Sequence, residues 1–260
     1  MKILRIALTG VVVLALVLAV LVWFMPARWA VAALGPRLHG MRLEQVHGLV
    51  WRGRAGRVLS ADGTDVGRVQ WTLSRRALLG DVCLQLALQK PGMTFSGKLH
   101  RLSDTEVEWS DARLQADAAL LDGMPWLRGN SLHGRLNVHI VDARLQGVWP
   151  MRLDATAQWQ DASVDEKGRH VALGDFRLRA QGSGGVIRLD LGDDGHGPLQ
   201  AAGEASLSPL GWRYRLVLTP RTNDPALRQW LAGFGQLSPD GTLLRQGSGG
   251  LARFTSRLEQ

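Results

Sequence analysis

The chain has 260 residues and carries 31 lysines and arginines against 23 aspartates and glutamates, a formal charge of +8. The basic excess is scattered and forms no stripe, and no nucleic-acid-binding module is recognisable, so we expect no nucleic-acid partner. Cys83 is the one cysteine, which excludes an internal disulfide and a thiolate cluster for zinc.

A strongly apolar run without a charged residue covers residues 6–25 and is followed by Pro26. A helix rises about 1.5 Å per residue, so a run of this length reaches across the roughly 30 Å of a bilayer's hydrocarbon core. We therefore expect a transmembrane signal anchor over residues 6–25, with residues 1–5 as a cytoplasmic tail. Residues 26–260 would then form one exported, β-rich domain.

A cleaved secretory signal is the alternative to this plan. Its apolar region would be about 7–15 residues long, which is shorter than the run here, with a small-x-small site soon after it. Ala30-Val31-Ala32 is the nearby sequence that could serve as that site. Basic residues lie on both sides of the run, including Lys2, Arg5 and Arg28, so the charge rule does not set the orientation. A short amino-terminal tail before a long domain is nevertheless the usual plan of a signal anchor.

Apolar and polar residues alternate along much of the remaining chain, as expected for strands with one buried face. The alternation is clearest over residues 69–73, 82–89, 136–140, 151–159, 176–181, 187–191 and 212–218. Turn residues separate these runs, including Ala61-Asp62-Gly63, Pro91-Gly92 and Pro239-Asp240-Gly241. The pattern predicts a mainly β, elongated and mostly antiparallel domain.

One clear helix is predicted at about residues 224–234. Asn223 or Asp224 would cap it, and Pro225 would occupy its first position. Apolar residues follow at helical spacing and would form one stripe against the sheet: Leu227, Trp230, Leu231 and Phe234. A second short helical stretch is expected at residues 29–34.

A weak internal repeat divides the exported domain into two related halves, about 36–130 and 131–260. Leu38-His39-Gly40 in the first half and Leu132-His133-Gly134 in the second each precede a Gly-x-Trp or Gly-x-x-Trp element and then a Gln-Trp pair. The intervals differ, so chance matching of common residues stays open beside two stacked β units.

The sequence nominates no catalytic, cofactor-binding or metal-binding residue, and we predict a non-enzymatic protein. The seven histidines lack the helical pairing and cysteine partners of a zinc site, and His133 and His139 would lie about 20 Å apart along a strand. The acidic loop at 190–196 lacks the spacing of a known calcium loop. The glycine-rich stretch 182–185 has no following lysine-serine pair, and no serine lies in a Gly-x-Ser-x-Gly elbow. A periplasmic hydrolase of another kind stays open.

Tryptophan is unusually frequent, with ten in the chain and eight between Trp51 and Trp230. We expect most of them to be core residues with the indole nitrogen bonded at an edge, while an exposed apolar groove is the alternative. Trp51 is the candidate for partner binding. The competing interpretation is structural: Gly48 and Gly53 would permit a bend that Trp51 anchors to the core.

A series of motifs in a fixed order resembles protein N of the type II secretion system. After the apolar run these are Pro26-Ala27-Arg28, residues 46–55 (VHGLVWRGRA), 67–73 (GRVQWTL), 78–80 (LLG), 132–134 (LHG), the 212–218 strand and the block from 224 to 251. Each motif consists of common residues, and together they cover nearly the whole chain.

The resemblance implies a non-enzymatic, inner-membrane-anchored component that supports export of folded periplasmic proteins across the outer membrane. It implies a single-pass protein with its β-rich domain in the periplasm. Its partners would be the inner-membrane platform proteins, the outer-membrane secretin and inner-membrane lipid. The family supplies no catalytic residues.

The sequence also bears on two other classes of envelope protein. A pseudopilin has a glutamate five residues beyond its cleavage glycine, whereas Ala15 stands at that distance from Gly10. The alternative function is that of a lipid-handling protein resembling AsmA-like envelope proteins, with the runs around Val82 and Met151 lining a groove for acyl chains. An apolar interior open to solvent would favour lipid handling, and a closed core with a small apolar patch would favour protein binding.

Overall fold

The computed structural model describes residues 21–34, 40–122, 130–166 and 168–250. The predicted anchor at 6–25 lies outside the described residues except for its last part, 21–25, and the predicted tail at 1–5 lies outside them entirely. Within the described ranges, no helix combines the length and the apolar character needed to cross a bilayer.

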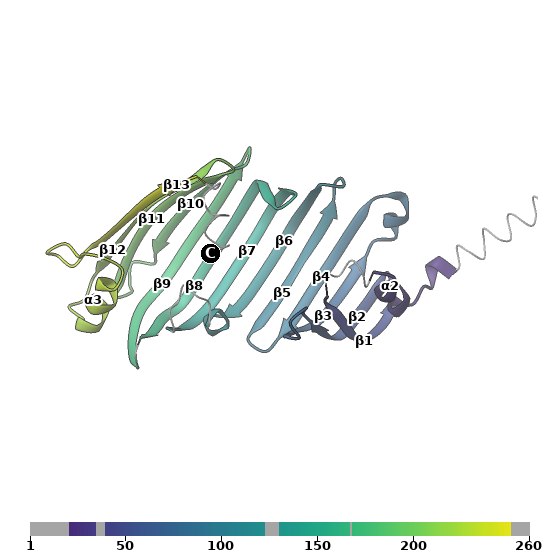
Figure 1. The fold of residues 1–260 in the computed structure, drawn as a ribbon, viewed down its shortest axis with the longest axis horizontal. Helices are drawn as coiled ribbons and strands as arrows, with labels where there is room; N and C mark the ends of the chain where they lie inside the picture. The colour runs from purple at the N-terminus through teal and green to yellow at the C-terminus, as the bar shows by residue number, and fades with distance from the viewer. Residues whose placement is uncertain (1–20, 35–39, 123–129, 167, 251–260) are drawn as a thin grey trace, which may run out of the picture. The chain divides into compact units, whose positions relative to one another are not determined.

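The chain divides into two compact units, Met1–Lys90 and Pro91–Gln260. Within each unit, consecutive strands pair antiparallel, which confirms the predicted mainly β, antiparallel fold (Figure 1). The predicted repeat halves concern sequence similarity rather than compactness, and they stay a prediction.

In the described residues, the first unit contains a helical stretch at 21–23 and, after it, one α-helix, four strands and one short 3₁₀ helix. These are α2 (Ala27–Leu34), β1 (Arg42–Leu49), β2 (Arg52–Leu59), β3 (Asp65–Leu73), η2 (Arg75–Leu79) and β4 (Val82–Lys90). The predicted helical stretch at 29–34 is part of α2, which lies against β1. The strands predicted at 69–73 and 82–89 are parts of β3 and β4.

The second unit contains nine strands, η3 and α3 in the described residues. They are β5 (Met93–Arg101), β6 (Glu106–Asp117), η3 (Ala118–Leu121), β7 (Ser131–Gln146), β8 (Trp149–Glu166), β9 (Arg169–Ser183), β10 (Val186–Asp193), β11 (Leu199–Ser208), β12 (Gly211–Pro220), α3 (Pro225–Ala232) and β13 (Leu243–Gly249). The predicted helix at 224–234 is α3, with the Asp224 side chain as its cap and Pro225 in its first turn, but it ends earlier than predicted, at Ala232. Phe234, predicted as part of the apolar stripe, lies beyond the helix and is 49 % exposed.

The strand register separates an apolar face from a polar face in the second unit. One row of directly paired residues across β6 to β12 is Leu114, Val138, Ala157, Leu178, Leu191, Gly203 and Leu216. The adjacent row on the opposite side is Arg113, His139, Thr156, Arg179, Asp190, Glu204 and Arg215. Successive strand residues point to opposite sides of a sheet, so this register makes one side apolar and the other polar.

The buried core of the second unit is gathered where α3 covers the apolar face. Leu227 and Leu231 of α3 are fully buried against residues of β9, β11 and β13, including Val171, Leu199 and Leu243. α3 lies beside β9 and β12 (Figure 1). The leucine and valine residues of the apolar row are only half-buried, so the helix covers part of this face and leaves the rest partly exposed.

Candidate functional site

The last residues of the predicted anchor are hydrogen-bonded to the first unit. Trp51 lies in the turn between β1 and β2 and is only 7 % exposed. Its indole Nε1 donates a hydrogen bond to the carbonyl oxygen of Val22 at 3.1 Å. The preceding turn residue also takes part, because Val50 N donates to Met25 O at 3.0 Å. Two hydrogen bonds therefore tie the segment at 22–25 to the β1–β2 turn.

The contact continues into α2. Pro26 forms an isolated β-bridge with Leu49, the last residue of β1. Ala27, the first residue of α2, is fully buried. A proline at this point lacks an N–H donor and has a fixed φ, so the chain can leave the bridge and begin a helix without losing a backbone hydrogen bond.

Two motifs of the sequence meet across β2 and β3. Gly53 is paired directly with Trp71, and a Cβ at Gly53 would lie 2.3 Å from Trp71 Cζ2. The Trp71 indole Nε1 donates to Val50 O at 3.0 Å, and Leu73 N donates to Trp51 O at 2.9 Å. Gly53 therefore makes room for the Trp71 ring, rather than permitting the bend expected from the sequence.

Gly48 does have the conformation expected of a bend, with a φ of +91°. It faces Gly53 across the β1–β2 pair, and a Cβ there would lie 2.5 Å from Arg52 O. These contacts account for both glycines around Trp51. The role of Trp51 as a partner contact stays a prediction.

The 3₁₀ helix η2 projects from the first unit between β3 and β4. The Ser74 hydroxyl accepts a hydrogen bond from Arg76 N at 3.2 Å, and Gly80 ends the helix with a φ of +90°. Arg75 reaches back to the N-terminal segment, where its Cζ lies 3.8 Å from the centroid of the Trp23 ring. An arginine over an indole face is a favourable cation–π contact.

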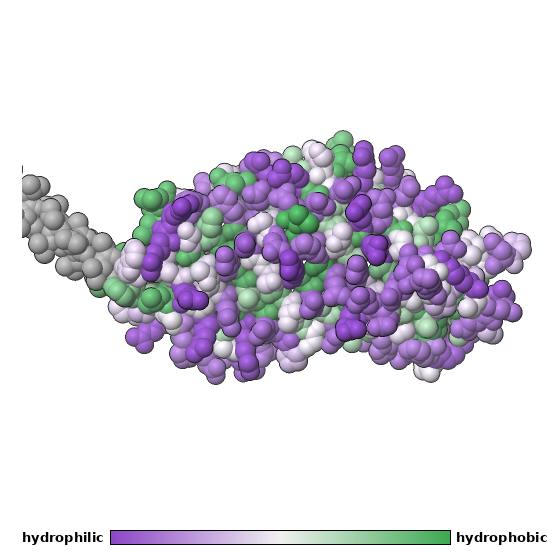
Figure 2. Space-filling model, turned by 180° about the vertical axis from the view of Figure 1, so that it is seen from behind, coloured by the Kyte–Doolittle hydropathy of each residue, from purple (hydrophilic) through white to green (hydrophobic). Residues whose placement is uncertain are grey.

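Exposed apolar side chains are concentrated on the two segments that this contact joins. Leu79 is 88 % exposed and Leu78 is 57 % exposed. We define the N-terminal apolar patch as Leu21, Trp23, Phe24, Trp29, Leu78 and Leu79. Figure 2 shows hydrophobic side chains in green near the first described residues, at the left of the view. Single exposed apolar residues are ordinary on a protein surface, whereas large contiguous apolar patches are typical of contact surfaces.

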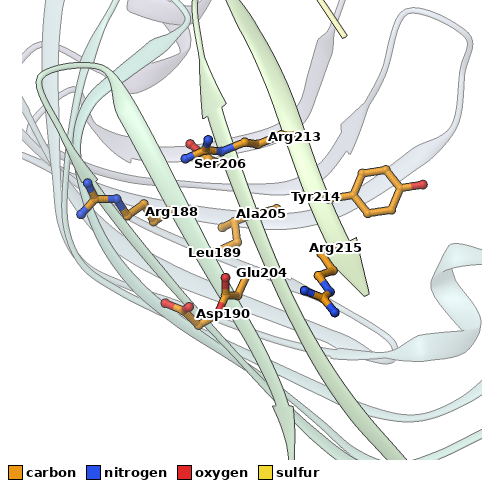
Figure 3. Close-up of a pocket in the computed structure, with 9 residues that line it drawn as sticks. All are labelled: Arg188, Leu189, Asp190, Glu204, Ala205, Ser206, Arg213, Tyr214 and Arg215. Atoms are coloured by element: carbon orange, nitrogen blue, oxygen red, sulfur yellow. The ribbon is translucent and has the colours of Figure 1, made fainter. Parts of the chain in front are cut away.

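A polar hollow lies in the second unit across β10, β11 and β12 (Figure 3). Its side chains from alternate strand positions are polar, and all but that of Ser206 are charged: Arg188, Asp190, Glu204, Ser206, Arg213 and Arg215. Asp190 and Glu204 are direct cross-strand neighbours, as are Glu204 and Arg215. No histidine lines the hollow beside Ser206, so its chemistry suits contact with a polar surface.

The histidines singled out in the sequence contact separate carboxylates. His133 Nε2 lies 2.8 Å from Asp165 Oδ2, and His139 Nε2 lies 3.2 Å from Asp111 Oδ1. Asp165 also contacts His170 Nδ1 at 2.8 Å. Hydrogen bonding to His170 and then to His133 lowers the pKa of Asp165. The geometry does not bring His133 and His139 to one site.

The acidic loop between β10 and β11 uses its carboxylates as acceptors for the protein's own donors. Asp193 accepts from Arg221 Nη1 at 2.6 Å, Gly195 N at 2.9 Å and Ala201 N at 3.0 Å. Asp194 accepts from the backbone N–H of His196 at 3.0 Å. Burial opposes ionisation of Asp193, but these hydrogen bonds together lower its pKa. The oxygens thus face N–H donors, as in a closed turn.

Sequence reasoning missed the exposure of Leu78 and Leu79, which it used only as part of a family motif. The available signal was two adjacent leucines that follow Arg75, Arg76 and Ala77, outside any alternating run. An alternating strand would place one of two adjacent leucines in the core, whereas a tight 3₁₀ turn exposes both.

Comparison with known proteins assigns the chain to a family. The model of the type II secretion system (T2SS) protein N family matches residues 39–244. A search of curated proteins and a search of solved structures each found no match. The match begins before β1 and ends within β13, so it includes the Trp51 turn, the Gly53–Trp71 pair, η2 and the polar hollow. The chain therefore belongs to the type II secretion system protein N family.

Proposed function

We propose that this chain is a non-enzymatic, single-pass inner-membrane component of the type II secretion machinery, with its β domain in the periplasm. The family match over residues 39–244 is the observation that carries the secretion role. The apolar run at 6–25 supports the anchor, because its length matches the hydrocarbon core of a bilayer.

The contacts around Trp51 would make the connection between the proposed anchor and the first unit rigid. Residues 22 and 25 are hydrogen-bonded to the β1–β2 turn, and Pro26 is bridged to Leu49. An anchored chain with this junction would hold the strands of the first unit in a set orientation at the membrane surface. A flexible linker would not, because it samples many end-to-end arrangements.

The partners in this proposal are the inner-membrane platform proteins and the outer-membrane secretin. The polar face of the second unit supports such contacts, since it presents arginines and carboxylates in register. Complementary charge of this kind favours correct partner choice and a fast encounter.

A second candidate function is favoured by the apolar row of the second unit. Leu114, Val138, Leu178, Leu191 and Leu216 lie in one register row and are only half-buried. An acyl chain needs apolar contact and no main-chain hydrogen bonds, so such a row would suit the lipid-handling alternative.

One isolation experiment separates the two candidates. The full-length chain is extracted from inner membranes in mild detergent, and both its co-isolated proteins and its tightly held phospholipid are quantified. Co-isolation of platform proteins and secretin, without stoichiometric lipid after detergent exchange, is the expected result. One or more phospholipids per chain, with no secretion protein, would replace the first function by the second. A matched sample carrying Leu114→Ser and Leu191→Ser tests whether any retained lipid depends on the apolar row.

A further inference from the structure

The most exposed apolar side chain of the first unit, that of Leu79, lies on a capped turn beside the exposed side chain of Leu78. η2 is capped at both ends, by the Ser74 hydroxyl and by Gly80 in the left-handed region. The cation–π contact between Arg75 and Trp23 joins η2 to the end of the apolar run. A 3₁₀ helix rises about 2 Å per residue, so Leu79 lies on the order of 8 Å along the helix from Arg75. Leu78 and Leu79 are therefore near the point where the proposed anchor would leave the bilayer.

The charges around these leucines suit an anionic lipid surface. Arg28, Arg75 and Arg76 are exposed in the same two segments. Asp81 lies 4.0 Å from Arg76 and offsets part of this charge. The balance of the four groups is positive. Juxtamembrane arginines are attracted to anionic headgroups, and tryptophan is enriched at the depth where the headgroups meet the acyl chains.

We infer that η2 is a second membrane contact, in which Leu78 and Leu79 insert into the headgroup region of the bilayer that receives the apolar run. The occupant of the N-terminal apolar patch is then the lipid surface itself, with Trp23 and Trp29 at the interface and Arg75 and Arg76 on the headgroups. The inference rests on the proposed anchoring of residues 6–25.

Two contacts would define the orientation of the first unit, where one would not. A single spanning helix permits rotation of the attached domain about the membrane normal and tilting away from it. The hydrogen bonds of Trp51 and Val50 resist tilting at the junction. Insertion of η2 adds a second point of attachment beside Trp23. The two points together fix the orientation of β1 to β4 relative to the bilayer plane.

Site-specific fluorescence in vesicles tests the inference. The full-length chain carries Cys83→Ser and one new cysteine, labelled with an environment-sensitive nitrobenzoxadiazole dye. It is reconstituted in vesicles of three parts phosphatidylcholine to one part phosphatidylglycerol, with or without a lipid that carries a nitroxide high on its acyl chain. The labelled positions are Leu79→Cys, Ala15→Cys within the apolar run, and Val148→Cys as the matched control. Val148 is 95 % exposed in the turn between β7 and β8.

The expected result is a blue-shifted Leu79 label whose emission the nitroxide lipid lowers at least two-fold, with the Val148 label unchanged. Leu79 emission equal to that of Val148, while Ala15 is quenched, would overturn the η2 contact and leave the anchor in place. Equal quenching at Leu79 and Val148 would also overturn it, because η2 would then have no special contact. Quenching at neither Leu79 nor Ala15 would overturn the anchor as well. Circular-dichroism melts of each labelled chain establish that the compared samples are folded.

Discussion

The indole nitrogen of Trp51 donates a hydrogen bond to the carbonyl oxygen of Val22, at a separation of 29 residues in the chain. Sequence patterns among neighbouring residues do not predict a contact between a β-turn residue and the end of an apolar run. The contact means that the side chain most prominent in the family motif is directed inward, to the segment that precedes α2. It also places a single buried side chain between the proposed anchor and the strands of the first unit.

Replacement of Trp51 should therefore lower stability before it affects any partner. Trp51→Ala removes a nearly buried indole and should cost about 3–5 kcal/mol of unfolding free energy. Trp51→Phe keeps much of the ring and should cost less, chiefly the lost hydrogen bond of about 1 kcal/mol. Denaturant unfolding of the purified chain measures both, with exposed Trp29→Ala as the control. Loss of partner capture by Trp51→Ala at an unchanged melting temperature would contradict the structural role.

The Gly53–Trp71 pair predicts a steric effect that a second substitution relieves. Gly53→Ala would place a Cβ at 2.3 Å from the Trp71 ring and should destabilise the chain by about 1–3 kcal/mol. Combining it with Trp71→Leu should cost less than the sum of the two single changes. Gly192→Ala is the matched control, because a Cβ there meets nothing within 4 Å and needs no unusual backbone angle. Strict additivity in the double-mutant cycle would argue against the close contact.

The alternating segments show what sequence can reveal of this fold. Residues 82–89 and 151–159 alternate because one side of their strands is apolar and the other is solvated, and both were correctly predicted as strands. β2 contains three arginines and two glycines in eight residues, and β13 contains glycine at alternate positions near its end, so neither shows a clear period of two. Their strand character comes from pairing with neighbours rather than from local pattern.

The candidate site was harder to predict for a physical reason. The fit of Trp71 over Gly53 depends on the register of β2 against β3, and the Trp51–Val22 bond depends on how the chain returns to its own beginning. Neither relationship is encoded within a window of neighbouring residues. The capping of α3 is such a local relationship: Asp224 is one of the two caps predicted, Asn223 being the other, and Pro225 is correctly predicted in the first turn.

The Asp193–Arg221 pair predicts acid sensitivity. Asp193 has a lowered pKa in the folded chain, so its contribution to stability is fully present above the ordinary aspartate pKa of about 3.9 and is lost as pH falls through its folded pKa. Asp193→Asn should therefore flatten the fall in unfolding free energy below about pH 4. The comparison uses denaturant unfolding from pH 7 to pH 3, with Asp104→Asn at an exposed ion pair as control. An equal fall in unfolding free energy at acid pH in Asp193→Asn and in the unsubstituted chain would refute this role.

The core beneath α3 should be sensitive to a single truncation. Leu231→Ala removes a fully buried side chain and should lower the unfolding free energy by about 2–5 kcal/mol. Leu210→Ala changes a leucine that is exposed at the β11–β12 turn and should stay within about 0.5 kcal/mol of the unsubstituted chain. Equal effects of the two substitutions, measured by thermal and denaturant unfolding, would show that α3 is not packed on the apolar face.

The most direct measurement of the central claim is secretion in a strain from which the gene has been deleted. An exported folded enzyme is assayed in the medium and in the periplasm, with a resident periplasmic enzyme as the leakage control and a plasmid copy of the chain for rescue. The account predicts that the exported enzyme accumulates in the periplasm and that the plasmid restores its release. Normal export in the deletion strain, together with increased detergent sensitivity, would contradict the secretion role and favour lipid handling.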